Sequence, residues 1–374
     1  MSASSAISPA SRPIFLAEFG ELGGAERCCL ALADWLHERN LPCHFVTYRN
    51  PVDIAQFAKY PLPVVELKPE MRARKKIAAL RAYFASRQPS APQVLTNGYQ
   101  EAMHATLAGL RGFHTLMHDT PALFGDAGQL RTIKQKLRLR ISNAIIGYGL
   151  RSGGRTFVNS EFLRADSRKD FGADAEIVRM GGMGDPQNFV PRRVEGTLNL
   201  LSVSRVEANK RIDWMLRALA ELERGANPLS SRVDWHLHIA GKGSLVEPLR
   251  SMAAELGIGP RAHFHGFVTD AQLEQLYAQA HLFLMPAVQG YGIPAIESLQ
   301  RGIPILLHRQ SGVSDILLNT PWATVLHGGE EEMPSKLAEA IEGVITGRQL
   351  AEPLPELPTE AGWSEEIARR CGWL

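Results

Sequence analysis

Short apolar runs alternate with segments of helical periodicity along the first half of the chain. The helical pattern is clearest in residues 25–39, where Leu30, Ala33 and Leu36 fall on one face. The apolar runs have the length of buried strands and occupy residues 13–17, 43–47, 64–67, 93–96 and 115–118. Strands separated by helices predict a doubly wound parallel sheet.

The second half repeats this alternation and predicts a second sheet of the same kind. Its strand-like runs are 198–204, 235–240, 262–265, 282–285 and 305–307, and its helical segments are 212–223, 245–256, 271–280 and 294–301. We therefore predict an α/β protein of two Rossmann-like domains, residues 1–185 and 196–350, that face each other across a central cleft. Glycines and prolines interrupt the joining stretch, 181–196. A short closing helix, 363–374, is expected to return to the first domain.

Composition agrees with two globular cores. The chain has 374 residues, of which 45% are hydrophobic and 21% charged. Residues 1–13 lack the basic start and apolar run of a signal peptide. Prolines and glycines interrupt the uncharged stretch 275–296, which argues against a transmembrane helix. The four cysteines match no zinc or redox spacing, so we expect reduced thiols in a cytoplasmic protein.

Charge is distributed unevenly along the chain. Residues 1–190 carry 24 Lys and Arg against 17 Asp and Glu, a net charge of +7, whereas the remainder carries −5. A basic first half indicates an anionic partner. Within it, the segment 131–141 has Ile133, Leu137 and Ile141 four residues apart, with five basic residues before and between them. This segment is either an interfacial helix that binds an anionic membrane or a core-facing helix with a solvated basic face.

Two glycines, Gly23 and Gly24, follow the first predicted strand and precede a helix. Glycines permit a tight turn and close backbone approach, and the helix start offers free N–H groups to an anion. A plain turn between strand and helix explains the same pattern, because short glycine motifs arise by chance.

A pair of cations, Arg205 and Lys210, follows the predicted strand 198–204. Ligands of open α/β sheets bind at the carboxyl ends of the strands. A planar guanidinium and an ammonium suit a diphosphate, whose negative charge grows as it leaves. The alternative is two surface cations on a solvated loop.

A third element, residues 286–297, runs from a strand through Gly290 and Gly292 into a helix. Pro294 lies in the first helical turn, where its missing N–H costs nothing. Glu297 could accept hydrogen bonds from ribose hydroxyls, or it could simply be an acidic residue favoured near a helix start.

In this order, the three elements resemble the retaining GT-B glycosyltransferases, specifically glycosyltransferase family 4 (group 1). The resemblance covers most of the chain. Further matching segments are His118-Asp119, Asn159-Ser160-Glu161, 185–191, Gly266-Phe267, and Ser311-Gly312-Val313 with Asp315.

The resemblance implies transfer of a sugar from a UDP- or GDP-sugar to a hydroxyl of a polysaccharide, lipopolysaccharide or glycolipid. The anomeric configuration would be retained, with neither metal nor cofactor. Arg205 and Lys210 would stabilise the leaving diphosphate, and His118 would contact or orient the sugar. The donor-binding residues implied are Gly23, Gly24, Arg205, Lys210, Gly266, Phe267, Gln289, Gly290, Tyr291, Gly292, Ile293 and Glu297.

The chain departs from the family pattern at two positions. Gln289 replaces a glutamate that contacts donor-sugar hydroxyls in the family, and an amide lacks charge-assisted strength. Ser204 replaces a glycine before Arg205. One alternative is therefore a nucleotide-sugar-binding protein that has lost catalysis at Gln289.

A second alternative, an NAD-type dehydrogenase, fits two Rossmann units but lacks a GxGxxG segment after the first strand. His118 could also be a structural residue at a strand end. His236 and His238 alternate on one predicted strand without a third ligand nearby in the sequence, so no metal is expected. No nucleic-acid partner is expected either.

Overall fold

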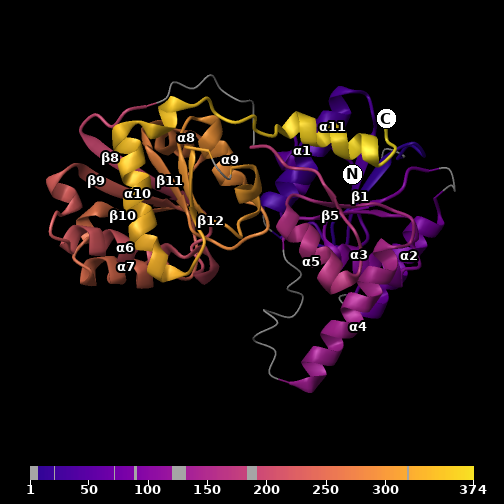
Figure 1. Cartoon of the computed structure of the whole chain (residues 1–374). Helices are drawn as coiled ribbons and strands as arrows, with labels where there is room; N and C mark the ends of the chain where they lie inside the picture. The colour runs from indigo at the N-terminus through magenta and orange to yellow at the C-terminus, as the bar shows by residue number, and fades with distance from the viewer. Residues whose placement is uncertain are drawn as a thin grey trace. The chain divides into compact units, whose positions relative to one another are not determined.

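The computed structural model describes residues 7–20, 22–70, 72–87, 91–119, 132–182, 192–317 and 320–374. The chain divides into two units, Met1–Met180 with Glu360–Leu374, and Gly181–Thr359 (Figure 1). Each unit contains its own parallel sheet. The segment 185–191, which was matched to a family landmark, lies outside the described residues, as does most of the expected linker.

The first unit is built on a seven-stranded sheet in the order β3-β2-β1-β4-β5-β6-β7. All of its pairings are parallel, with Arg12 opposite Cys43 and Thr96 opposite Thr115. Its strands are β1 (Arg12–Phe15), β2 (Cys43–Thr47), β3 (Val64–Glu66), β4 (Leu95–Thr96), β5 (His114–Met117), β6 (Thr156–Val158) and β7 (Glu176–Ile177). The central strands are buried on both faces, which explains why they appear in the sequence as continuous apolar runs.

Helices cover both faces of this sheet (Figure 1). Its helices are α1 (Gly24–Glu38), α2 (Ala73–Ala85), α3 (Tyr99–Leu107), α4 (Ile133–Leu150), α5 (Glu161–Phe171) and α11 (Glu360–Arg370). One core joins Phe15, Val46 and Tyr48 of the sheet region to Leu80 of α2 and Ile146 of α4. On the other face, α1 packs against α11.

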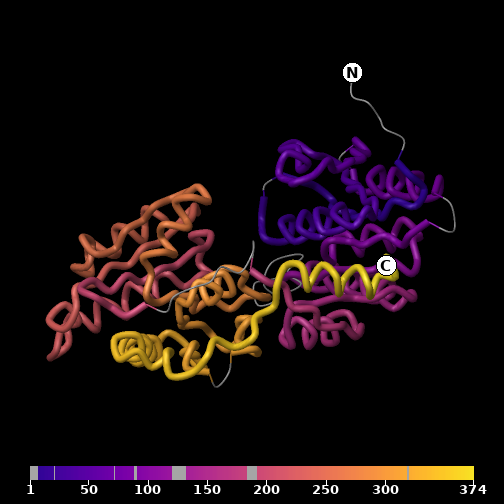
Figure 2. The backbone as a smooth tube through the Cα atoms, turned by 90° about the horizontal axis from the view of Figure 1, so that it is seen from above, coloured from indigo at the N-terminus to yellow at the C-terminus, as the bar shows by residue number. Residues whose placement is uncertain are grey.

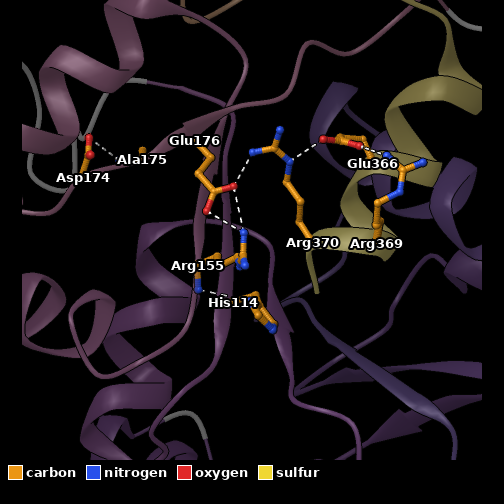
Figure 3. Close-up of polar contacts among 8 residues, drawn as sticks. All are labelled: His114, Arg155, Asp174, Ala175, Glu176, Glu366, Arg369 and Arg370. Carbon is orange, nitrogen blue, oxygen red and sulfur yellow. Dashed lines mark hydrogen bonds and ion pairs between the residues drawn. The ribbon is translucent and has the colours of Figure 1, made fainter. Parts of the chain in front are cut away.

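The C-terminal helix α11 belongs to the first unit, although the whole of the second unit, Gly181–Thr359, separates it in sequence from the rest of that unit (Figure 2). Its buried side chains include Trp363 and Ile367. Arg370 forms an ion pair with Glu176 of β7, and Glu176 also accepts from Arg155 at 3.1 Å (Figure 3). The chain end is therefore attached to an edge strand of the first sheet.

The second unit contains a six-stranded parallel sheet in the order β10-β9-β8-β11-β12-β13. In β9, alternate side chains point to opposite faces: Trp235 and Leu237 join the main core, whereas His236 and His238 do not. Its strands are β8 (Thr197–Val203), β9 (Asp234–Ala240), β10 (Ala262–Gly266), β11 (Leu282–Met285), β12 (Ile305–His308) and β13 (Ala323–Leu326).

The main core of this unit lies between the sheet and three helices. Met215 of α6, Leu249 of α7 and Leu337 of α10 pack against Trp235 and Leu237. Its helices are α6 (Ile212–Arg224), α7 (Val246–Glu255), α8 (Asp270–Gln279), α9 (Ile293–Gln300) and α10 (Met333–Thr346). Among the residues that the structure describes, no helix is both long and apolar enough to cross a membrane.

Candidate functional site

The strand order of the second sheet places β8 beside β11. From this pair the sheet continues in both directions, through β9 and β10 on one side and through β12 and β13 on the other. Such a switch point at the carboxyl ends of parallel strands is where open α/β sheets bind ligands. Arg205 and Lys210 lie in the first loop, and residues 289–292 lie in the second.

A direct contact joins these two loops. Lys210 Nζ lies 2.6 Å from Gln289 Oε1, and Gln289 Nε2 lies 2.7 Å from Met285 Sδ. The ammonium therefore donates to the amide oxygen of the residue where a family glutamate was expected. Arg205 is exposed, and its guanidinium makes no hydrogen bond or ion pair with any described residue. A positive face thus forms at the switch point.

The glycine loop after β11 has a conformation that only glycine accepts readily. Gly292 has a φ of +117°, and a Cβ there would lie 2.6 Å from Gln289 Nε2 and 2.7 Å from Met285 Cε. A second segment secures the loop: Gly312 N–H donates to Gln289 O at 3.1 Å and Ser311 Oγ to Tyr291 O at 3.0 Å. The Tyr291 ring is buried, so only the backbone of this residue is available to contact a nucleotide sugar.

Glu297 lies within α9, which begins at Ile293 directly after Gly292. The residue is 9% exposed, and its Oε2 accepts a hydrogen bond from the Tyr277 hydroxyl at 3.1 Å. Burial and this carboxylate together raise the pKa of Tyr277 well above its usual range, so the tyrosine keeps its proton. The buried Tyr277 therefore holds the Glu297 carboxylate in place.

An exposed aromatic ring follows the edge strand β10. Phe267 is 69% exposed, and Lys242 Nζ lies 4.8 Å from the centroid of its ring. Lys242 lies between Gly241 and Gly243 after β9, and a Cβ on Gly241 would lie 1.8 Å from Ser204 O. Sequence reasoning missed this Gly-Lys-Gly segment, although a Gly-x-Gly run directly after a predicted strand was the available signal.

The first sheet has its own switch point, between β1 and β4. Gly23 caps the N-terminus of α1, where its N–H donates to Glu26 Oε2 at 3.1 Å, and Gly24 is the first helical residue. Glu101 of α3 accepts from Ala17 N–H at 3.0 Å, and burial raises the pKa of this carboxyl to about 7. The loops after β1 and β4 are therefore linked at this edge.

His118 follows β5 on the same edge and is half-buried. Its Nε2 lies 2.8 Å from Asn97 Oδ1, in the loop after the neighbouring strand β4. Burial lowers the pKa of His118 to about 4, so the ring is neutral at pH 7. Asn97 carried no signal in the sequence, because it lies 21 residues away from His118.

Four histidines lie together on β9 and β10. His238 Nδ1 lies 3.0 Å from His265 Nε2, and His263 Nε2 lies 2.9 Å from His236 Nδ1. The fold thus brings two further histidines beside the pair seen in the sequence. These rings pair with one another, however, and no three His, Cys, Asp or Glu side chains within the described ranges are arranged to hold one metal ion.

The helix α4 exposes its first half. Ile133, Leu137 and Ile141 are 86%, 56% and 53% exposed, so the interpretation of a core-facing helix is wrong for this part. At 100° per residue these three form one stripe. Basic residues flank it on both sides, Lys136 and Arg140 on one and Lys134 and Arg138 on the other.

Comparison with known families identifies the second unit. Residues 185–356 match the family described as Glycosyl transferases group 1. This range contains the Lys210–Gln289 contact, the glycine loop and Glu297. The second unit is therefore a glycosyltransferase group 1 domain.

Characterised relatives align with part of the chain. The GDP-mannose-dependent alpha-(1-6)-phosphatidylinositol monomannoside mannosyltransferase of Mycolicibacterium smegmatis is 28% identical over 192 residues, which is 46% of this chain and 48% of that protein. The alpha-monoglucosyldiacylglycerol synthase of Streptococcus pneumoniae is 24% identical over 169 residues, or 44% of this chain and 37% of that protein. The chain spans about half the length, or less, of the curated relatives it matches.

Solved structures resemble the whole chain. WaaG, a glycosyltransferase involved in lipopolysaccharide biosynthesis, has a TM-score of 0.68 at 18% identity, over 96% of this chain and 95% of its own. Anabaena HepE in complex with UDP and glucose has a TM-score of 0.69 at 15% identity, over 97% and 100%. These likenesses confirm the predicted fold class, two Rossmann-like α/β domains of the GT-B type.

Proposed function

We propose that this chain, whose second unit is a glycosyltransferase group 1 domain, transfers a sugar from a UDP- or GDP-sugar to a hydroxyl acceptor with retention of anomeric configuration. The observation that carries the proposal is the meeting of Lys210 with Gln289 at the switch point of the second sheet. A cation there faces the position where a diphosphate binds in such folds. The relatives named above support the donor class, since one uses GDP-mannose and one neighbour binds UDP.

In this proposal the bond between the anomeric carbon and the diphosphate oxygen breaks, and its electron pair stays on the diphosphate. Arg205 and Lys210 stabilise the growing negative charge, which makes a metal ion unnecessary. The acceptor oxygen then bonds to the anomeric carbon, and its proton passes to the departing diphosphate oxygen. His118 contacts the sugar or orients it.

Donor binding is assigned to the carboxyl edge of the second sheet. The N–H groups of the Gly290–Gly292 turn and the start of α9 hold phosphate or sugar oxygens. Glu297, fixed by Tyr277, accepts from the ribose hydroxyls. The exposed ring of Phe267, with Gly266 before it, stacks on the base.

A thermal-shift screen with UDP, GDP and NAD tests this assignment. We expect UDP or GDP to raise the melting temperature and NAD to leave it unchanged. Stabilisation by NAD alone would contradict the proposal. The Arg205→Ala/Lys210→Ala double variant should lose nucleotide-sugar turnover, whereas Lys336→Ala, which removes a surface cation paired with Glu339, should retain it.

The second candidate is a nucleotide-sugar-binding protein without turnover, which the neutral amide of Gln289 favours. The two candidates predict different results for the same experiment. A binding protein would be stabilised by the nucleotide sugar yet release no nucleotide over time, and the double variant would only weaken its binding.

We further propose that the acceptor is a glycolipid or another membrane-associated glycan and that the protein docks on an anionic membrane through α4. The exposed stripe of Ile133, Leu137 and Ile141 supplies the apolar contact. The flanking lysines and arginines supply attraction to anionic headgroups.

A further inference from the structure

The His118 ring is held by a single residue of the neighbouring loop. Asn97 is 9% exposed, and its backbone N–H donates to Phe15 O at 3.0 Å, which fixes it to β1. Its side-chain Oδ1 lies 2.8 Å from His118 Nε2. Three adjacent strand ends, those of β1, β4 and β5, therefore determine the orientation of the imidazole.

The identity of the contacting atoms determines where the ring proton lies. An amide oxygen only accepts hydrogen bonds, so Nε2 of His118 must be the donor. In a neutral imidazole the other nitrogen then carries a lone pair. His118 Nδ1 makes no hydrogen bond with any residue in the described part of the chain.

We infer that Asn97 is a positioning residue that holds His118 in the Nε2–H tautomer, so that Nδ1 accepts a hydrogen bond from a sugar hydroxyl. The role of the hydroxyl rests on the proposed function, whereas the tautomer does not. A neutral acceptor suits this position, because positive charge develops on the sugar as the diphosphate departs. A protonated ring would donate from both nitrogens and repel that charge.

Long-range ¹H–¹⁵N spectroscopy of the ¹⁵N-histidine-labelled protein measures the tautomer directly, with His118→Gln to assign the signal. We expect the Nε2–H tautomer in the wild type. Asn97→Leu should give a mixture of tautomers, and Asn97→Asp should keep Nε2–H and raise the pKa of His118 by about 1 to 3 units, since a carboxylate stabilises the imidazolium. An Nδ1–H ring in the wild type, or a ring insensitive to Asn97→Leu, would overturn the inference.

The pH dependence of turnover gives the second readout. Asn97→Leu should lower kcat about tenfold, the size expected when one orienting hydrogen bond of about 1.4 kcal/mol is lost. Asn97→Asp should move the acid limb of the kcat profile upward. Asn199→Asp is the matched control, because Asn199 Oδ1 lies 3.3 Å from Nε2 of a different ring, His238. It should shift the titration of His238 and leave kcat unchanged.

The two proposals fail in different ways. A wild type with the Nε2–H tautomer that turns over no nucleotide sugar contradicts the proposed function and the hydroxyl contact, but not the positioning by Asn97. An active enzyme whose kcat is unaffected by Asn97→Leu contradicts the inference alone.

Discussion

Gln289 is the residue where the chain departs from its family pattern and also the residue that Lys210 contacts. Gln289→Glu would turn this hydrogen bond into a salt bridge and place a carboxylate at the proposed donor site. We expect the relative kcat/KM values for UDP- and GDP-sugars to change by about fivefold or more, which corresponds to about 1 kcal/mol. The measurement is turnover of a nucleotide-sugar panel by both proteins. Unchanged rate and ranking would mean that the departure is neutral.

Position 292 in the loop after β11 requires glycine. Gly292→Ala adds a Cβ 2.7 Å from Met285 Cε at a φ of +117°. We expect a loss of about 1–3 kcal/mol in unfolding free energy or, if the loop shifts instead, a similar loss in nucleotide binding. Urea denaturation and nucleotide titration distinguish the two. Gly257→Ala is the control, since its φ is also positive but no atom lies within 4 Å of the added Cβ.

Residues can be predicted from the sequence where a motif is local, but not where a contact joins distant segments. Gly290, Gly292 and Glu297 lie within one short segment, and their order along the chain was informative. The Lys210–Gln289 contact spans 79 residues and the Asn97–His118 contact 21, so both depend on strand order. The burial of Tyr291 could not be inferred either, because an aromatic between two glycines looks the same when exposed.

At the scale of elements, α4 carries the membrane prediction. Ile133→Ser/Leu137→Ser should reduce binding to vesicles of phosphatidylcholine with phosphatidylglycerol about tenfold or more, because two exposed apolar side chains lose their contact. Wild-type binding should vanish at high salt.

Sedimentation with these vesicles measures both effects. Leu107→Ser, at a 41% exposed position of α3, should bind as the wild type does. Equal binding to neutral phosphatidylcholine vesicles, or no binding at all, would contradict membrane docking through α4.

Two substitutions in α11 compare the contributions of apolar packing and of a surface ion pair to the attachment of this helix. Ile367→Ala removes a fully buried side chain and should cost about 2–5 kcal/mol of unfolding free energy. Arg370→Ala breaks an ion pair that is about one-third exposed on both sides and should cost about 1 kcal/mol or less. Denaturation curves of the two variants make the comparison, and equal losses would show that the ion-pair network, not the apolar face, holds the helix.

At the scale of the whole molecule, acid should weaken the first unit. Burial lowers the pKa of His44, His104 and His114 to about 4, below the unfolded value of about 6.5. Between these values the unfolded chain binds more protons, so stability is lost as pH falls from 6.5 towards 4. Each group contributes up to about 1.4 kcal/mol per pH unit. Glu101, whose pKa is raised to about 7, opposes them, as do Asp34 and Asp166, whose pKa values burial also raises. His118, with a pKa lowered to about 4, adds to the loss.

Urea denaturation at pH 7.5, 6.5 and 5.5 tests this dependence. We expect little change between the first two values and a clear loss at the third. His114→Gln should reduce this loss of unfolding free energy by the contribution of one histidine. A midpoint that does not move between pH 6.5 and 5.5 would contradict the lowered pKa values.

The whole fold was more predictable than its site. Apolar runs that alternate with helical segments predicted both sheets, because parallel strands that are buried on two faces form continuous apolar segments. The strands β6, β7 and β13 were not predicted. β6 and β7 have three and two residues, too few to show a period, and alternate residues of β13 are half-buried. A closing helix at 363–374 was expected to return to the first domain, and α11 (Glu360–Arg370) lies in the first unit.

The return of α11 has a consequence for the order in which the protein is made. The residues of the first unit up to Met180 leave the ribosome before the second unit, yet α1 lacks the helix that packs against it until Glu360–Leu374 have been synthesised. The second unit is one uninterrupted segment and can fold while the first is still incomplete. The apolar surface that α11 will bury is therefore exposed throughout synthesis of the second unit, and the unit translated first becomes the unit completed last.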